Sequence, residues 1–64
     1  MMIGERLKTY RIINSFDQET VADMLNWDVS LIQNIECGKV IPNLEQIVKL
    51  CDVLKISAKR FLSI

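Results

Sequence analysis

The sequence predicts an all-α fold, built as a compact set of five short helices. Apolar residues recur at intervals of three and four through most of the chain, which is the period of a helix with one buried face. Asp, Asn or Ser stands directly ahead of four of these runs, where its side-chain oxygen can cap a first turn. No stretch alternates apolar and polar residues as a half-buried strand does. We therefore expect helices only.

The first helix is expected over about residues 3–14, and its inward-facing positions are Ile3, Leu7, Tyr10 and Ile13. The second helix follows the N-cap Asp17 and ends near Leu25. The third follows the N-cap Asp28 and ends near Cys37. Gly38 suits the left-handed residue that commonly follows a helix.

A tight bend joins the second and third helices. Asn26 lies where the bend needs a positive φ, which Asn tolerates better than most residues. The buried positions of this region are Val21, Ala22, Leu25, Trp27, Ile32 and Ile35. By spacing alone the pair fits a helix-turn-helix and an ordinary αα-hairpin about equally well.

The C-terminal third is predicted to hold two further helices. Pro42 excludes helix immediately before it, and Asn43 then caps a helix in which Gln46 can complete a capping box. The inward positions of this helix are Leu44, Ile47, Val48, Cys51 and Leu54. Ser57 caps a last short turn that carries Phe61 and Leu62.

Composition predicts one small cytoplasmic domain. Half of the 64 residues are hydrophobic, yet no apolar run approaches the roughly 18 residues of a membrane span, and no signal peptide is evident. Two cysteines at wide spacing and the lack of histidine argue against a zinc site or a disulfide scaffold. Cys51 is expected in the core, and Cys37 is expected as an exposed thiol. No metal or cofactor is expected.

From Ile3 to Leu62 the chain resembles the Cro/CI type of helix-turn-helix domain, the five-helix, lambda repressor-like (XRE-type) module, with its motif at about residues 18–37. The residues that carry the resemblance run in one register: Arg11, Asp17-Gln18-Glu19, Val21-Ala22, Leu25, Ile32, Ile35-Glu36, Gly38-Lys39, Pro42-Asn43-Leu44-Glu45, Leu54 and Phe61-Leu62. The resemblance implies a partly buried ion pair between Arg11 and Glu36, with a structural role.

The resemblance also implies a DNA-binding surface. Gln18 would anchor a phosphate at the start of the second helix, and Lys39 would approach the next phosphates. The outward residues of the third helix would meet base edges in the major groove, namely Val29, Ser30, Gln33 and Asn34. Without the motif, the same polar residues would simply form a solvated helix face.

The charge distribution weakens the DNA-binding interpretation. The net charge is zero, and residues 17–36 contain five acidic residues and no Lys or Arg. Because phosphate neutralisation supplies most nonspecific affinity, a single copy should bind DNA weakly. Val29 and Leu31 would also make the reading surface unusually apolar. These departures leave room for a protein partner in place of DNA.

These observations together predict a sequence-specific transcriptional regulator, a repressor of operator DNA that acts as a homodimer. Self-association is expected through the C-terminal segment, where four large apolar residues fall in the last nine: Ile56, Phe61, Leu62 and Ile64. The alternative is a non-enzymatic interaction module, such as an antitoxin, antirepressor or regulatory subunit. No arrangement of residues suits acid–base or nucleophilic catalysis, so an enzyme is not expected.

Overall fold

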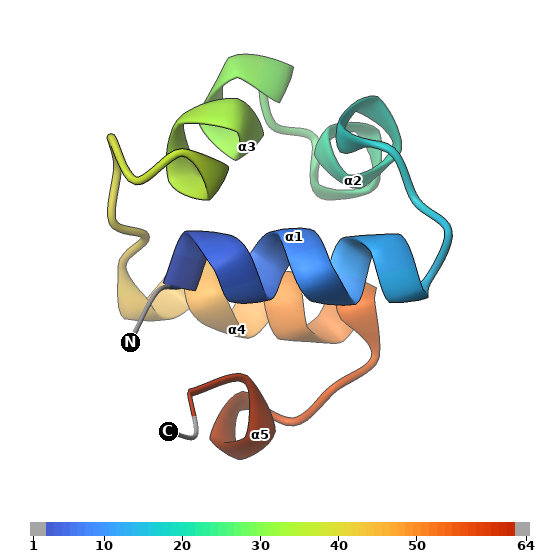
Figure 1. Cartoon of the computed structure of the whole chain (residues 1–64), viewed down its shortest axis with the longest axis vertical. Coiled ribbons are helices and arrows are strands. Elements are labelled where there is room, and N and C mark those ends of the chain that lie inside the picture. The colour runs from blue at the N-terminus through green and yellow to red at the C-terminus, as the bar shows by residue number, and fades with distance from the viewer. Residues whose placement is uncertain (1–2, 63–64) are drawn as a thin grey trace.

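The computed structural model describes residues 3–62 and contains five α-helices in that range. Their bounds are Ile3–Ile13 (α1), Gln18–Leu25 (α2), Val29–Glu36 (α3), Leu44–Leu54 (α4) and Ala58–Leu62 (α5). Figure 1 shows α1 in the middle, with α2 and α3 on one side, α5 on the other and α4 running alongside. The described residues form no strand, which confirms the all-α prediction. None of their helices is long and apolar enough to cross a membrane.

A single apolar core draws on all five helices. Its most deeply buried large side chains are Leu7, Val21, Ile32, Ile35, Leu50, Leu54 and Phe61. Partly buried apolar residues surround this centre, among them Trp27 and Leu25. Because every helix contributes to one cluster, the position of each helix depends on the others.

The capping residues predicted for the last two helices are confirmed. The Asn43 side chain accepts a hydrogen bond from the Gln46 amide at 2.8 Å, and the Gln46 side chain accepts one from the Asn43 amide at 3.0 Å. This reciprocal pair is the expected capping box. The Ser57 hydroxyl accepts a hydrogen bond from the Arg60 amide at 3.1 Å, which begins α5.

Three predicted core positions are instead exposed. Ile13 is 68% exposed, Leu44 70% and Val48 46%. Ile13 ends α1, and Leu44 is the first residue of α4. The buried face of α4 is formed by Ile47, Leu50, Cys51 and Leu54. Leu44 and Val48 were predicted from helical spacing, which places them near this face but does not show how far the core extends around the helix.

The two cysteines occupy the places that the sequence predicted. Cys51 is buried and Cys37 is exposed, and both are free thiols. Burial raises the pKa of the Cys51 thiol, and the neighbouring Asp52 carboxylate adds to this effect. Cys51 is therefore a protonated core residue at neutral pH.

Gly4 lets α1 approach the end of α3 closely. A Cβ atom at this position would collide with the backbone carbonyl oxygens of Ile35 and Glu36. Nothing in the local sequence around Gly4 predicts this contact, because the crowding comes from a helix about thirty positions away along the chain.

Asn14 joins the ends of two helices. Its side-chain amide donates hydrogen bonds to the carbonyl oxygens of Tyr10, at 2.9 Å, and Leu54, at 3.1 Å. The ends of α1 and α4 therefore share one capping residue. The sequence did not predict this role of Asn14, because Leu54 lies 40 positions away along the chain.

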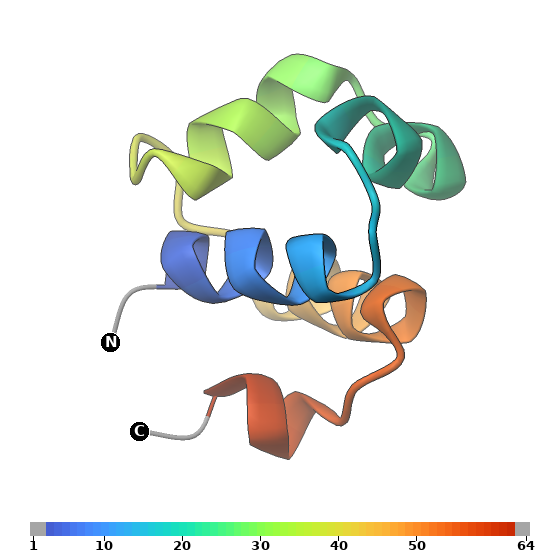
Figure 2. The same ribbon diagram turned by 45° about the vertical axis from the view of Figure 1, so that its right-hand side comes forward.

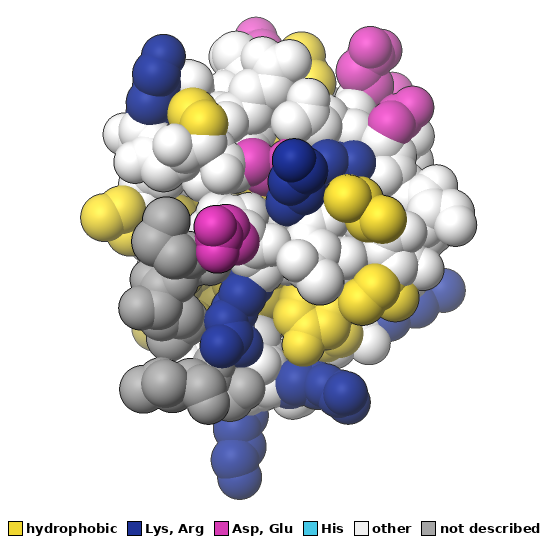
Figure 3. All heavy atoms as spheres, viewed as in Figure 1, with side chains coloured by type: hydrophobic (Ala, Val, Ile, Leu, Met, Phe, Trp, Pro, Cys, Tyr) yellow, Lys and Arg dark blue, Asp and Glu magenta, His cyan; other side chains and the backbone are white. Residues whose placement is uncertain are grey.

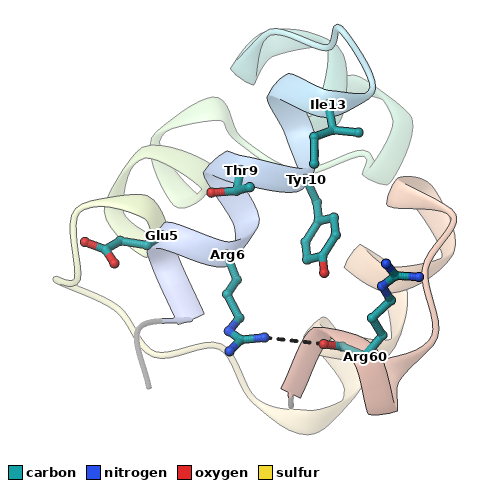
Figure 4. A pocket seen from close by; sticks show the side chains of 6 residues that line it. All are labelled: Glu5, Arg6, Thr9, Tyr10, Ile13 and Arg60. Atoms are coloured by element: carbon teal, nitrogen blue, oxygen red, sulfur yellow. Dashed lines mark hydrogen bonds between the residues drawn. The ribbon is translucent and has the colours of Figure 1, made fainter. Parts of the chain in front are cut away.

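α5 closes the core against α1. Phe61 is fully buried and its ring lies 6.3 Å from that of Tyr10, centroid to centroid. The Arg6 guanidinium donates to the carbonyl oxygens of Arg60 and Phe61 at 3.4 Å each, and a hollow of about 510 Å³ lies beside it (Figure 4). Most of the apolar C-terminal segment is thus used internally, while Ile64 lies outside the described residues.

Candidate nucleic-acid interface

α2 and α3 are joined by the tight bend that the sequence predicted. Asn26 adopts the left-handed conformation, with φ 58° and ψ 39°, and ends α2. The next amide, that of Trp27, donates to the carbonyl oxygen of Ala22 at 2.9 Å, as in a helix C-cap. Trp27 is partly buried against the core. In Figure 2, α3 lies along the top of the molecule, on the opposite side from α5.

Both N-caps of the motif are confirmed. The Asp17 carboxylate accepts from the Thr20 amide at 2.7 Å, and the Asp28 carboxylate accepts from the Ser30 amide at 2.9 Å. Interactions with the Thr20 hydroxyl and then its amide lower the pKa of Asp17. The Ser30 amide, followed by its hydroxyl, lowers the pKa of Asp28. Both carboxylates are therefore held in the charged form.

Behind α3 lies the predicted ion pair between Arg11 and Glu36. The Arg11 Nε donates to Glu36 Oε2 at 2.7 Å and the Arg11 Nη2 to Glu36 Oε1 at 3.1 Å, so the contact is bidentate. Only 11% of the Arg11 side chain and 6% of the Glu36 side chain remain exposed. Arg11 also donates to the carbonyl oxygen of Phe16 at 2.9 Å. The pair therefore ties α1 to α3 and to the loop before α2.

Gln18 joins this ion pair. Its side-chain Nε2 donates to Glu36 Oε1 at 3.1 Å, and the residue is partly buried. We call Arg11, Gln18 and Glu36 the hub. The sequence prediction gave the Gln18 side chain to a DNA phosphate, but in this structure it points inward. The Glu36 carboxylate has hydrogen-bond acceptor positions left after pairing with Arg11, and the Gln18 amide donates to one of them.

The outward face of α3 is narrower than predicted. Ser30 and Gln33 are exposed, as expected, whereas Val29 and Asn34 are only partly exposed. Val29 packs against the core, and so does Leu31. Both side chains stay partly exposed, so the expected apolar character of the reading surface stays a prediction.

The loop after α3 carries Lys39, two residues beyond the C-cap Cys37. Gly38 has φ 85°, which confirms it as the left-handed residue that follows the helix. The Lys39 and Val40 amides donate to the carbonyl oxygen of Asn34 at 2.9 and 3.1 Å, so the backbone of the loop is anchored to α3. The Lys39 side chain is exposed. We call Ser30, Gln33 and Lys39 the outer face of α3.

The charged side chains of α2 are all acidic. Figure 3 shows them over α2 at the upper right, while several Lys and Arg side chains project from the lower side of the molecule. Glu19 and Asp23 of α2 are both exposed. The outer face of α3 thus offers amide and hydroxyl groups and one ammonium group beside a negatively charged helix.

The hydrogen-bonding groups of this surface suit the recognition of a polar ligand. Amide and hydroxyl side chains can both donate and accept, which is what recognition of base edges or of a polar protein surface requires. Among residues 3–62, no three His, Cys, Asp or Glu residues lie close enough to hold a metal ion.

The fold and the bend define a helix-turn-helix protein, and comparison with known proteins agrees. A family model described as "Helix-turn-helix domain" matches residues 4–63. A protein of Bacillus subtilis strain 168 is 36% identical over 55 residues, covering 86% of this chain and 80% of its own; its name is "Uncharacterized HTH-type transcriptional regulator YazB". No solved structure matches significantly. The chain belongs to the Cro/CI-type, or XRE-type, family of helix-turn-helix domains.

Proposed function

We propose that this protein is a sequence-specific DNA-binding transcriptional regulator that reads the major groove with α3. The observation that carries the proposal is the outer face of α3, where Ser30 and Gln33 are exposed on the helix and Lys39 is exposed in the loop after it. Membership of the helix-turn-helix family supports it, as does the name of the Bacillus relative. The second helix of such a motif enters the groove with its outward residues toward the bases.

Each residue of the outer face has a role in this proposal. The Gln33 amide bonds an adenine edge through both of its polar atoms, and the Ser30 hydroxyl accepts or donates to a neighbouring base. Lys39 neutralises a phosphate and carries no sequence information. Asn34 and Val29 reach a base only through the part of each side chain that stays exposed.

The phosphate contact at the start of α2 is assigned to the backbone. The Gln18 side chain donates to Glu36, and the Thr20 N–H is bonded to the Asp17 carboxylate. The backbone N–H groups of Gln18 and Glu19, at the very start of α2, therefore take the place of the Gln18 side chain as the anion-binding groups. The exposed carboxylates of α2 oppose this contact. We therefore expect one copy to bind DNA weakly, and two copies on a two-fold site to bind it with higher affinity. Occupancy of such a site would regulate transcription by blocking access of the polymerase.

A second candidate is an interaction module that binds a protein. The acidic surface of α2 favours it, because a basic partner would gain from the charges that weaken DNA binding. The outer face of α3 would then contact that partner with the same polar groups.

Selection of duplex fragments from a genomic library, at low and at moderate salt, tests the proposed function. We expect a small set of fragments that share one motif and that are retained at both salt concentrations. If only fragments of random sequence are recovered, and only at low salt, the protein binds DNA through nonspecific electrostatic attraction and not by sequence. Recovery of no fragment at all would overturn the proposal in favour of the protein partner.

A further inference from the structure

A hollow lies between α1 and α5, on the other side of α1 from α3 (Figure 2). Its volume is about 510 Å³. We call it the α1–α5 hollow, and its lining residues are Glu5, Arg6, Thr9, Tyr10, Ile13 and Arg60. Sites that bind small molecules usually have volumes of about 300–1,000 Å³. The hollow is therefore large enough for a small organic ligand.

Two guanidinium groups line the hollow, one from each helix. Figure 4 shows the Tyr10 side chain pointing from α1 toward α5, with its hydroxyl group between Arg6 and Arg60 in this view. Arg6 donates to the carbonyl oxygens of Arg60 and Phe61, which holds its side chain against α5. A guanidinium has five N–H donors, so it can bind an anion in addition to the contacts that it already makes. Thr9 and Tyr10 add two hydroxyl groups that can donate to the same anion.

The charges around the hollow favour an anion. Glu5 is the one acidic residue in its lining, and its side chain points away from the other five (Figure 4). Lys55 and Lys59 are exposed near Arg60 in the sequence, and residues 53–62 contain no Asp or Glu. A concentration of one sign of charge at a hollow raises the local concentration of the opposite ion. The end of the molecule at α5 is thus the counterpart of the acidic α2.

The hollow also has an apolar part. The Tyr10 ring forms one wall, and Ile13 lies at the end away from Arg6 in Figure 4. Ile13 is 68% exposed, although its spacing predicted a core position. A hydrocarbon group that covers Ile13 would remove apolar surface from water, which is favourable. The hollow therefore suits a ligand with one charged end and one apolar end.

We propose that the α1–α5 hollow binds a small organic anion, a carboxylate or a phosphate ester with an apolar body. The charged end meets Arg6 and Arg60, since guanidinium groups bond both kinds of anion through paired N–H groups. The apolar body lies against Tyr10 and Ile13. The hollow shares no residue with the outer face of α3, so its ligand does not compete with DNA.

Binding is expected to be weak, with a dissociation constant in the millimolar range for a simple probe. The Arg60 and Thr9 side chains are exposed, and ion pairs in contact with water contribute little. Phenyl phosphate is a suitable probe, because it combines a phosphate group with an aromatic body. Inorganic phosphate and phenol each represent one half of it.

Nuclear magnetic resonance titration of the full chain, labelled with ¹⁵N, tests the site. We expect phenyl phosphate to shift the amide signals of Arg6, Thr9, Tyr10 and Arg60, with saturation at one site. Inorganic phosphate and phenol should each bind at least about fivefold more weakly, because each lacks one half of the contacts. Equal affinity for phosphate and phenyl phosphate would overturn the inference, and so would shifts centred elsewhere.

Phenylacetate in the same titration distinguishes the two kinds of anion. A tighter fit of phenylacetate assigns the hollow to carboxylates, and a tighter fit of phenyl phosphate assigns it to phosphate esters. If neither probe saturates the hollow, the inference is wrong.

Two neighbouring residues of α5 provide a matched pair of variants. Arg60 lines the hollow and Lys59 does not, while both side chains are exposed. Arg60→Gln and Lys59→Gln each remove one positive charge. We expect Arg60→Gln to weaken the binding of phenyl phosphate at least about fivefold, and Lys59→Gln to change it within about twofold. Equal weakening would show that only the overall charge attracts the probe, which would overturn the inference.

The apolar contact is tested by a second matched pair. Ile12 and Ile13 are both exposed at the end of α1, and only Ile13 lines the hollow. Ile13→Gln should weaken the binding of phenyl phosphate by about threefold or more and leave the binding of inorganic phosphate unchanged. Ile12→Gln should change neither. Circular dichroism confirms that the variants remain folded. Wild-type affinity of Ile13→Gln for phenyl phosphate would remove the apolar part of the site.

The outcomes separate this inference from the proposed function. A chain that binds phenyl phosphate in the hollow but binds no duplex leaves the inference standing and removes the DNA-binding proposal. Where a selected duplex binds, phenyl phosphate at constant ionic strength should not displace it. Displacement together with shifted amide signals of Ser30 and Gln33 would place the probe on the outer face of α3. That result would overturn the inference and leave DNA binding intact.

Discussion

The two sides of α3 differ in what their polar side chains do. On the inner side, Glu36 is almost fully buried and accepts three hydrogen bonds from Arg11 and Gln18. On the outer side, Ser30 and Gln33 are exposed to solvent. The inner groups are committed to holding α1, α2 and α3 together, and the outer groups remain available to a ligand. Polar residues on one short helix can thus serve stability or binding according to the side they occupy.

The largest effect is expected from breaking the hub. Arg11→Ala leaves the nearly buried Glu36 carboxylate without its cation and should lower the free energy of unfolding by about 3–5 kcal/mol. Urea denaturation measures the loss. Arg11→Met/Glu36→Leu is the control, since removal of both charges should cost clearly less than Arg11→Ala. If the double variant is the less stable of the two, the burial cost of an unpaired charge is not the cause.

The next largest loss of stability is expected at Gly4, where α1 lies closest to the end of α3 that carries Glu36 of the hub. Gly4→Ala places a Cβ against the backbone carbonyl oxygens at the end of α3, which cannot yield as a flexible side chain would. We expect a loss of about 1–3 kcal/mol in stability. Lys8→Ala, at an exposed position of the same helix, is the matched control and should change stability little. Equal denaturation midpoints for the wild type and Gly4→Ala would contradict the close approach of α1 and α3.

A smaller, stabilising effect is expected in the loop beside the hub. Ser15 has φ 59°, a conformation that costs a residue with a Cβ but not glycine. Ser15→Gly should therefore raise stability by about 1 kcal/mol or less, because the greater freedom of glycine in the unfolded chain offsets part of the gain. Asn26→Gly, at φ 58°, should gain less, since Asn tolerates this region better. Thermal unfolding of both variants tests the order.

The smallest effect is on the dependence of stability on pH. Asp17 and Asp28 have pKa values below their ordinary 3.8 in the folded protein. The stability that their charged forms contribute is therefore complete above the unfolded pKa and is lost as pH falls through the lower folded values. Asp28→Asn keeps a capping oxygen but no titrating group, so its stability should fall less steeply below about pH 4 than that of the wild type. Identical slopes would exclude a contribution from this carboxylate.

Much of the fold could be predicted because it depends on neighbours in the sequence. The caps Asp17, Asp28, Asn43 and Ser57 each bond to a residue two or three positions ahead. Asn26 and Gly38 adopt the positive φ that their positions required. The hub pair of Arg11 and Glu36 was accessible only through the resemblance to a known family, because 25 positions separate the two residues.

What could not be predicted depends on distant partners. The side chain of Gln18 turns inward because Glu36 lies there, and Gly4 matters because the end of α3 approaches it. Leu44 and Val48 have the spacing of core residues, yet the small core does not extend to them. Helical periodicity gives the direction of a side chain but not the area of the surface that covers it.

The difference between the two sides of α3 is tested most directly by Gln33→Ala, measured in two ways. Fluorescence anisotropy with the best selected duplex gives the affinity, and urea denaturation gives the stability. The account predicts a loss of about 1–3 kcal/mol in binding to that duplex and a change in unfolding free energy within about 0.5 kcal/mol. Wild-type affinity in Gln33→Ala, or a loss of binding that merely follows a loss of stability, would contradict it.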